Sequence, residues 1–129
     1  MSPPVIVVVA AVIEEDGRLL VTRRQRGTHL EGCWEFPGGK REPGETNEQA
    51  LGREIVEELG AGVVDPREVF VSSHVYPDRS VELHFFRCAL GGPPRPQLGQ
   101  ELRWVRPADL LEIPFPPADA EFIQRFLLS

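Results

Sequence analysis

The chain has 129 residues and a formal charge of −6, so we expect a single domain covering residues 1–129 with one hydrophobic core. An acidic balance without a dominant basic patch argues against a nucleic-acid polymer as the partner. No apolar run reaches the length of a membrane span, and the opening residues lack the basic region of a signal peptide. Two cysteines without metal-type spacing suit free thiols in a reducing compartment, so we expect a cytoplasmic protein without a membrane partner.

The first residues predict two paired β-strands. Residues 5–13 are continuously apolar and rich in β-branched side chains, which is typical of a central strand buried on both faces. Asp16-Gly17 is a local hairpin signal, so we expect the chain to return as a second strand over residues 18–24. Arg24 belongs to the basic run at its end. That run suits either a solvated strand terminus or a phosphate contact through the fixed fork of arginine donors.

Residues 46–60 predict one helix with both ends marked. Thr46 is a good N-cap with Gln49 three residues later, as in a capping box. Gly60 stands at the usual position after the last helical residue. Between these ends the apolar residues recur every four positions and form one stripe. They are Leu51, Ile55 and Leu59.

Three glutamates lie beside this stripe, at positions 54, 57 and 58. Their spacing places all three carboxylates on one edge of the helix, where like charges repel by about 0.2–0.5 kcal/mol per pair. One neighbouring cation, Arg53, cannot balance three anions. Mg²⁺ would balance them, because it takes oxygen ligands and leaves sites for water and substrate phosphates. A run of acidic residues is also typical of a solvated face, so the helix alone leaves both interpretations open.

The second half of the chain predicts further strands and two helical segments. Residues 63–64 and 69–75 are strand-like, and residues 81–90 alternate as the partner strand of an antiparallel hairpin. Residues 100–105 form another short strand, Pro107 can open a helical turn, and residues 118–128 form a final amphipathic helix. Strands before, between and after helices indicate an α/β sandwich with a mixed central β-sheet.

The stretch from Gly39 to Gly60 resembles the Nudix box. Every position of the motif through Gly60 is matched at the right spacing. The last position usually carries a larger aliphatic residue, and here it is Ala61. The matching residues are Gly39, Glu45, Arg53, Glu54, Ile55, Glu57, Glu58 and Gly60. The resemblance implies a Nudix-type α/β/α sandwich. It also implies a hydrolase of a nucleoside diphosphate linked to another group, with Mg²⁺ or Mn²⁺ as cofactor.

Cleavage of a pyrophosphate bridge suggests roles for these residues. The phosphate oxygens repel a nucleophile, and a metal ion offsets this charge and lowers the pKa of a bound water. We therefore expect three metal-ligating side chains, Glu54, Glu57 and Glu58. The resemblance adds the carbonyl of Gly38 as a further ligand. We expect Arg53 to orient one glutamate and Glu45 to brace the loop onto the helix.

The identity of the general base stays open. Nudix enzymes of this kind draw a further carboxylate from a loop before a late strand, and Leu98 stands at that position. Glu101 is the available substitute, so the base is either Glu101 or a glutamate of the helix. An acidic strand residue is also typical of a solvated surface.

Further segments resemble the MutT subgroup, which cleaves 8-oxo-dGTP to the monophosphate and pyrophosphate. They are residues 21–24, 34–40, 77–79 and 115–119. Carried over position by position, the resemblance places four residues near the nucleotide, namely Arg24, Phe36, Asp78 and Arg79. It places Asp119 at the base edge, where the bacterial MutT pattern has asparagine. An aspartate is also common at a helix start, where the helix dipole favours it.

The charge state of Asp119 bears on the preferred base. An ionised carboxylate only accepts hydrogen bonds, so it suits guanine N1–H and its exocyclic amine, or a cytosine amine. The leading hypothesis is an 8-oxo-dGTP or dGTP pyrophosphohydrolase that cleans the nucleotide pool and so serves DNA replication and repair. The alternatives are hydrolysis of CTP, dCTP or 5-methyl-dCTP, and a noncatalytic Nudix module that only binds a nucleotide. A monomer and a homodimer both remain open.

Overall fold

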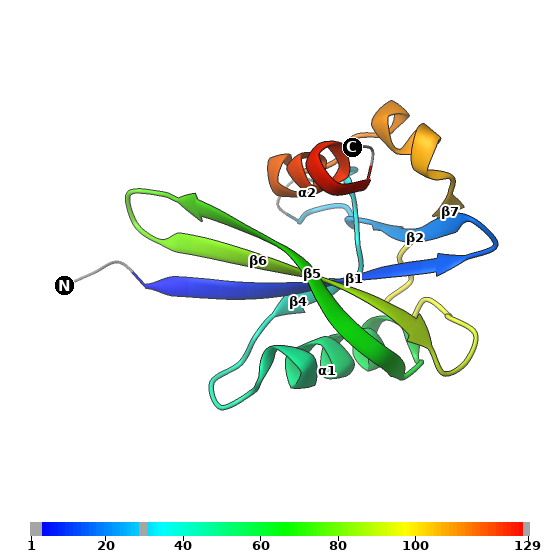
Figure 1. The fold of residues 1–129 in the computed structure, drawn as a ribbon, viewed down its shortest axis with the longest axis horizontal. Coiled ribbons are helices and arrows are strands. Elements are labelled where there is room, and N and C mark those ends of the chain that lie inside the picture. Colours follow the sequence, from blue (N-terminus) through cyan, green and yellow to red (C-terminus); the bar gives the residue numbers. More distant parts are fainter. Residues whose placement is uncertain (1–3, 29–30, 128–129) are drawn as a thin grey trace.

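A seven-stranded mixed β-sheet carries the fold, with helices packed against both faces (Figure 1). The computed structural model describes residues 4–28 and 31–127, apart from the side chain of Phe126. In chain order the elements are β1 (Val5–Glu15), β2 (Arg18–Arg23), β3 (Trp34–Glu35), β4 (Gly38–Lys40), α1 (Asn47–Leu59), β5 (Val63–Val75), β6 (Ser80–Leu90), β7 (Leu102–Val105), the 3-10 helix η1 (Pro107–Glu112), α2 (Pro117–Phe122) and the π-helical turn η2 (Ile123–Leu127). The prediction of an α/β sandwich with a mixed central sheet is confirmed.

Strand β1 is the centre of the sheet, as its sequence predicts. It pairs with β6 in parallel, with β4 antiparallel, and near its end with β2. Residues 9–13 are buried on both faces, because α1 covers one side and α2 the other. Val5 is 55% exposed, since the first part of β1 runs beside the end of the β5–β6 hairpin that projects past α2 (Figure 1).

Two local signals set the strand connections. Asp16 and Gly17 both adopt positive φ, 52° and 74°, as a two-residue type I′ hairpin turn requires. The strand-like runs around Asp65 form one strand, β5, although the sequence suggests two. Asp65 has a φ of 50°, and the pairing with β6 shifts register between Val64 and Arg67. A β-bulge therefore absorbs the interruption without ending the strand.

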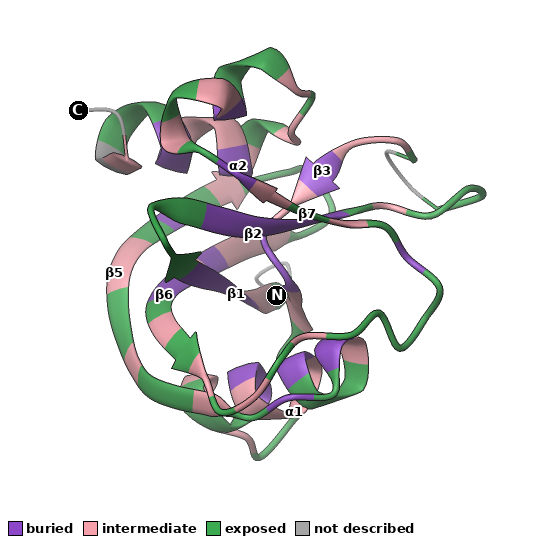
Figure 2. Ribbon diagram, turned by 90° about the vertical axis from the view of Figure 1, so that its right-hand side faces the viewer, coloured by how far each residue is buried: buried purple, intermediate pink, exposed green. Residues whose placement is uncertain are grey.

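The two faces of the sheet bury separate apolar clusters (Figure 2). On one face α1 contributes Ala50, Leu51, Ile55 and Leu59, all fully buried against β1 and β6. On the other face an aromatic cluster fills the space beneath α2. There Phe122 stacks on Phe85 of β6, with ring centroids 4.0 Å apart and planes 8° from parallel. Each helix is therefore held by its own core, and β1 lies between them.

The short elements depart most from the sequence prediction. Strands β3 and β4 have two and three residues, too few for a period to show. The final helix is α for six residues and then a π-helical turn; residue 128, its expected end, lies outside the described residues. Throughout the described ranges, every helix is too short or too polar to span a membrane.

Candidate active site

Helix α1 presents its glutamates because both its ends and its rotation are fixed. Thr46 and Gln49 form the predicted reciprocal capping box, with hydrogen bonds of 2.9 and 3.1 Å. Gly60 follows the helix with a φ of 67°, the left-handed conformation that glycine adopts readily. The buried apolar stripe then sets the rotation of the helix. Glu54 and Glu58 consequently face β4, and Glu57 faces solvent.

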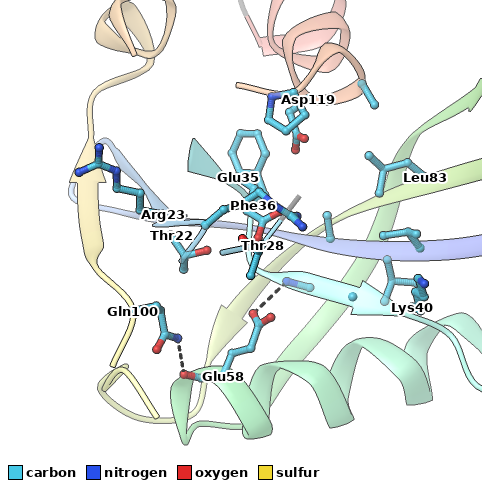
Figure 3. A pocket seen from close by; sticks show the side chains of 18 of the residues that line it. Thr22, Arg23, Thr28, Glu35, Phe36, Lys40, Glu58, Leu83, Gln100 and Asp119 are labelled. Atoms are coloured by element: carbon cyan, nitrogen blue, oxygen red, sulfur yellow. Dashed lines mark hydrogen bonds and ion pairs between the residues drawn. The ribbon is translucent and has the colours of Figure 1, made fainter. Parts of the chain in front are cut away.

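The two glycines of β4 make room for their neighbours, Gly39 for the carboxyl of Glu54 and Gly38 for the backbone of β1. A Cβ atom on Gly39 would lie 2.4 Å from the carboxyl carbon of Glu54, and one on Gly38 would lie 1.9 Å from the carbonyl oxygen of Val9. The Gly38 N–H donates to Oε2 of Glu58 at 3.1 Å (Figure 3). The backbone of β4 and the helix glutamates, which the sequence assigns to one metal site, therefore lie together.

We expect Gly39→Ala to weaken metal binding and turnover while the protein still folds. The added methyl meets the mobile end of the Glu54 side chain, so the carboxyl is displaced and the sheet backbone is not. We expect the apparent Mg²⁺ affinity and kcat to fall about 10- to 100-fold, as when a partner that orients a metal ligand is lost. Steady-state kinetics across a Mg²⁺ titration measure this effect.

Gly52→Ala is the matched control, because a Cβ at Gly52 of the same helix meets nothing within 4 Å. It should leave kinetics unchanged and raise the melting temperature slightly, since alanine favours helix more than glycine does. Wild-type metal dependence in Gly39→Ala would show that the position of the Glu54 carboxyl is unimportant.

Arg53 joins the loop before α1 to the carboxylate edge of the helix. Its guanidinium donates to both carboxyl oxygens of Glu45 at 2.7 and 2.9 Å, to Glu54 at 3.0 Å and to the Lys40 carbonyl at 3.0 Å. The hydrogen bonds from Arg53, together with one from the Glu42 backbone, lower the pKa of Glu45 to about 2. Glu45 thus braces the loop, and Arg53 holds one oxygen of Glu54.

A cavity of about 470 Å³ opens beside these carboxylates, between the α1 and α2 layers. Glu58 of α1 and Asp119 of α2 reach it from opposite sides, with Glu35 and Phe36 between them (Figure 3). Phe36 lines the cavity. It is only 3% exposed, because its ring also packs in the aromatic core against Phe122. The predicted residues Arg24, Phe36, Gly38, Glu58 and Asp119 all line this one space.

The α1 end of the cavity crowds carboxyl groups whose ionisation is costly without a cation. Burial first, and then repulsion from Glu35, Glu54 and Glu57, raises the pKa of Glu58 to about 8. Burial also raises the pKa of Glu54, although Arg53 opposes the effect. Among the described residues no three acidic, histidine or cysteine side chains converge closely enough to hold a metal ion. Glu54 and Glu57 turn toward Arg53, while Glu58 turns toward Gly38. Carboxyl and carbonyl oxygens nevertheless fit a hard divalent cation in donor chemistry, and a bound cation would favour ionisation of the carboxyls.

Asp119 stands at the opposite end of the cavity, and Glu35 acts on the carboxyls of both ends. Asp119 is 6% exposed, and burial, reinforced by Glu35, raises its pKa to about 8. Burial raises the pKa of Glu35 as well, although Arg24 opposes this with a 2.9 Å ion pair. Asp119 is therefore mostly protonated at neutral pH, which differs from the ionised carboxylate assumed from the sequence.

Two residues of the cavity were missed by sequence reasoning. Glu35 lies inside a segment that resembles MutT. Strand β3 has only two residues, which is too short for an alternating pattern to show which way the Glu35 side chain points. Gln100 is buried, donates to the Glu58 carbonyl at 2.9 Å and accepts from the Leu98 N–H at 2.9 Å. It fastens the loop before β7 to the end of α1, and no local pattern marks it.

Six predicted residues do not line the cavity. Arg53, Glu54 and Glu57 form the carboxylate edge of α1 beside it, and the other three lie elsewhere. Asp78 and Arg79 are exposed at the turn between β5 and β6, and Arg79 lies over the ring of Tyr76. Glu101 is half exposed, and its carboxylate pairs with Arg23 and Arg103 at 3.5 Å each. None of the three lines the cavity, so their nucleotide and catalytic roles stay predictions.

Comparison with known proteins defines the class of this chain as Nudix hydrolases. The family model described as the NUDIX domain matches residues 8–125, and the chain belongs to the Nudix hydrolase family. It is 36% identical over 115 residues to the CTP pyrophosphohydrolase of Escherichia coli strain K12, covering 88% of this chain and 85% of that protein.

Two further matches agree with this assignment. The chain is 37% identical over 114 residues to the 8-oxo-dGTP diphosphatase of Haemophilus influenzae, covering 88% and 84% of the two chains. The solution structure of the E. coli ORF135 protein superposes with a TM-score of 0.86 at 36% identity, covering 98% of this chain and 91% of that one. The predicted family and enzyme class are confirmed.

Proposed function

We propose that this Nudix hydrolase cleaves nucleoside triphosphates to the monophosphate and pyrophosphate with Mg²⁺ or Mn²⁺. The observation that carries the proposal is one cavity with two carboxyl ends, Glu58 at one side and Asp119 at the other. A nucleotide has the matching polarity, with a charged phosphate end and a hydrogen-bonding base end. Phe36 and the Arg24–Glu35 pair lie between these ends and would contact the sugar and base.

The phosphate end would bind the metal through Glu54, Glu57, Glu58 and the Gly38 carbonyl. A bound divalent ion offsets phosphate charge and lowers the pKa of a bound water. The contribution of the chain is to place the oxygens, through Arg53 on Glu54 and the Gly38 N–H on Glu58. We favour a helix glutamate as general base, because Glu101 does not line the cavity and its carboxylate pairs with Arg23 and Arg103.

The protonation of Asp119 supports an oxidised guanine as substrate base. With a pKa of about 8, its carboxyl at neutral pH donates through O–H and accepts through C=O, as the asparagine amide of the bacterial MutT pattern does. An 8-oxoguanine edge offers an N7–H donor beside the O6 acceptor, which complements such a group. The substrate would then be 8-oxo-dGTP, and dGTP would fit less well because its N7 accepts a hydrogen bond and cannot donate one. The role in the cell would be cleaning of the nucleotide pool.

A second candidate, a cytidine triphosphate, is favoured by the same carboxyl. A neutral acid can donate to cytosine N3 and accept from its N4 amine, and Glu35 supplies another acceptor close by. The relative named CTP pyrophosphohydrolase is as similar to the chain as the relative named 8-oxo-dGTP diphosphatase. CTP, dCTP and 5-methyl-dCTP therefore belong in the test.

The test is a panel of 8-oxo-dGTP, dGTP, CTP, dCTP and 5-methyl-dCTP, with pyrophosphate and orthophosphate measured separately, with and without EDTA. We expect pyrophosphate release that EDTA abolishes, and one base preferred over the others. Equal efficiency on 8-oxo-dGTP and dGTP would defeat the pool-cleaning role. Nucleotide binding without turnover at any metal concentration would instead identify a noncatalytic module.

Asp119→Asn should change the ranking of bases and leave the metal dependence unchanged. The amide keeps one donor and one acceptor, whereas the carboxyl can carry its proton on either oxygen and loses it near pH 8. We therefore expect relative kcat/KM values to shift about 10-fold at pH 8, the worth of one buried hydrogen bond, and less at pH 6. The panel at pH 6, 7 and 8 measures this shift. An unchanged ranking would show that position 119 does not read the base.

The same variant should also be more stable than wild type at alkaline pH. The folded pKa of Asp119, about 8, exceeds its ordinary value of 3.8, so between these values the folded state binds more protons and stability falls as pH rises. Asparagine does not ionise, which removes this fall. Thermal melts from pH 5 to 9 test the slope, with the exposed Glu112→Gln as the control variant.

A further inference from the structure

Helix α2, which carries Asp119, is tied to edge strand β5 through a polar contact at Glu121. Ser72 of β5 is 3% exposed, and its hydroxyl donates to Oε2 of Glu121 at 3.0 Å. His74 Nε2 lies 3.0 Å from the Ser72 oxygen and 3.6 Å from Glu121 Oε2. Arg125 donates to the other carboxyl oxygen of Glu121 at 3.2 Å. This cluster lies outside the cavity lining.

The direction of each hydrogen bond follows from the donors present. A serine hydroxyl has one proton, and it is given to Glu121, so Ser72 must accept from His74. The imidazole therefore carries its proton on Nε2 in this contact. His74 orients the hydroxyl, and the hydroxyl in turn fixes the Glu121 carboxylate.

Helix α2 is held by contacts on two sides. It has six α-helical residues, begins after Pro116 and has no side-chain N-cap hydrogen bond, and so short a helix is marginal by itself. On the core side Phe122 packs against Phe36, Phe70 and Phe85, and the Phe36 backbone N–H donates to the Asp119 carboxyl. The Ser72–Glu121 hydrogen bond is directional and holds the other side of the helix to β5.

Rotation of α2 would move Asp119. At 3.6 residues per turn, residues two positions apart point to nearly opposite sides of a helix. Glu121 therefore points to β5 when Asp119 points into the cavity. A rotation that releases Glu121 from Ser72 also turns the Asp119 carboxyl away from its place in the cavity.

We propose that Ser72 is a positioning residue that sets base selectivity by holding Asp119, through Glu121, at the base end of the cavity. The proposal rests on the proposed function, in which Asp119 reads the base. Ser72 does not touch the substrate itself.

The test compares Ser72→Ala with Ser73→Ala, a control at the exposed next residue of the same strand. We expect Ser72→Ala to raise KM for the preferred triphosphate about 5- to 10-fold, the worth of one hydrogen bond. The kcat/KM for the preferred triphosphate should therefore exceed that for the others by a smaller factor than in wild type. The kcat and the Mg²⁺ dependence should stay near wild type. Ser73→Ala should change neither.

Further variants separate positioning from simple stability. Ser72→Thr keeps the hydroxyl and should restore the base ranking. Glu121→Gln keeps an acceptor and should resemble wild type, whereas Glu121→Ala should resemble Ser72→Ala. The double variant with alanine at both positions should be no worse than either single one, because both remove the same contact.

Dissociation constants for the monophosphates dGMP, 8-oxo-dGMP and CMP, measured by calorimetry in EDTA, make the test independent of hydrolysis. Absence of turnover in wild type on every triphosphate would defeat the proposed function, yet the binding ranking would still test Ser72. The positioning role is overturned if Ser72→Ala lowers the melting temperature but keeps the wild-type ranking in both kinetics and binding. It is equally overturned if wild type shows no ranking at all.

Discussion

Glu58→Gln is expected to lower kcat about 100-fold or more while the protein keeps its fold. The substitution is nearly isosteric, so the amide oxygen can still accept from the Gly38 N–H, which lies 3.1 Å from the carboxylate. What is lost is a carboxyl that can ionise and so balance a bound cation at the α1 end of the cavity. Loss of a residue that only orients a metal ligand typically costs 10- to 100-fold, and loss of a charged ligand should cost at least as much.

The stability of the same variant separates this explanation from misfolding. In the metal-free protein the pKa of Glu58 is about 8, raised from 4.5 by burial first. The folded state binds more protons than the unfolded state between these values, so Glu58 destabilises the protein increasingly as pH rises. Glutamine removes this effect. In EDTA, Glu58→Gln should melt at a higher temperature than wild type at pH 8 and at nearly the same temperature at pH 4.

Glu48→Gln is the control, since Glu48 is exposed in the first turn of the same helix. It should leave kcat and melting behaviour close to wild type. Full activity of Glu58→Gln with added Mg²⁺ would contradict the assignment of Glu58 as a metal ligand.

The α1 end of the site could be predicted because its information is local. The capping box, the four-residue apolar stripe and Gly60 determine where α1 begins, which face it buries and where it ends. The orientation of Glu54 and Glu58 follows from those three features alone. The glycines of β4 belong to the same stretch, and the structure shows the physical reason for them, because the Glu54 carboxyl occupies the space of a side chain on Gly39.

The base end could not be predicted in the same way, because it depends on contacts between distant segments. The pKa of Asp119 is raised by burial of its side chain and by repulsion from Glu35 of β3. Neither cause follows from the sequence around position 119. Gln100 is buried only because the loop before β7 folds against the end of α1. Glu101 is predicted at the site but does not line the cavity. Its side chain pairs instead with Arg23 of β2 and Arg103 of β7, which the local sequence does not indicate.

Arg53→Lys is expected to reduce turnover and apparent Mg²⁺ affinity about 10- to 100-fold, although the positive charge is retained. A guanidinium presents a fork of donors, and here it holds Glu45 through both oxygens while it also reaches Glu54 and the Lys40 carbonyl. A single ammonium group cannot make this set of contacts from one position. Loss of the contact to Glu54 frees a carboxylate that we propose as a metal ligand, and the expected cost is that of an orienting partner.

The acid sensitivity of Arg53→Lys distinguishes the loss of this brace from a general loss of stability. Arg53 holds the pKa of Glu45 at about 2, below its ordinary 4.5, so the contact stabilises the protein above pH 4.5 and the benefit is lost as pH falls toward 2. The difference in melting temperature between wild type and variant should therefore be largest near pH 7 and shrink in acid. It should also shrink in high salt, since the Glu45 carboxylate is accessible to screening ions. Arg18→Lys, on the exposed start of β2, is the control and should show no such pattern. Wild-type metal affinity in Arg53→Lys would mean that Glu54 keeps its position without the arginine.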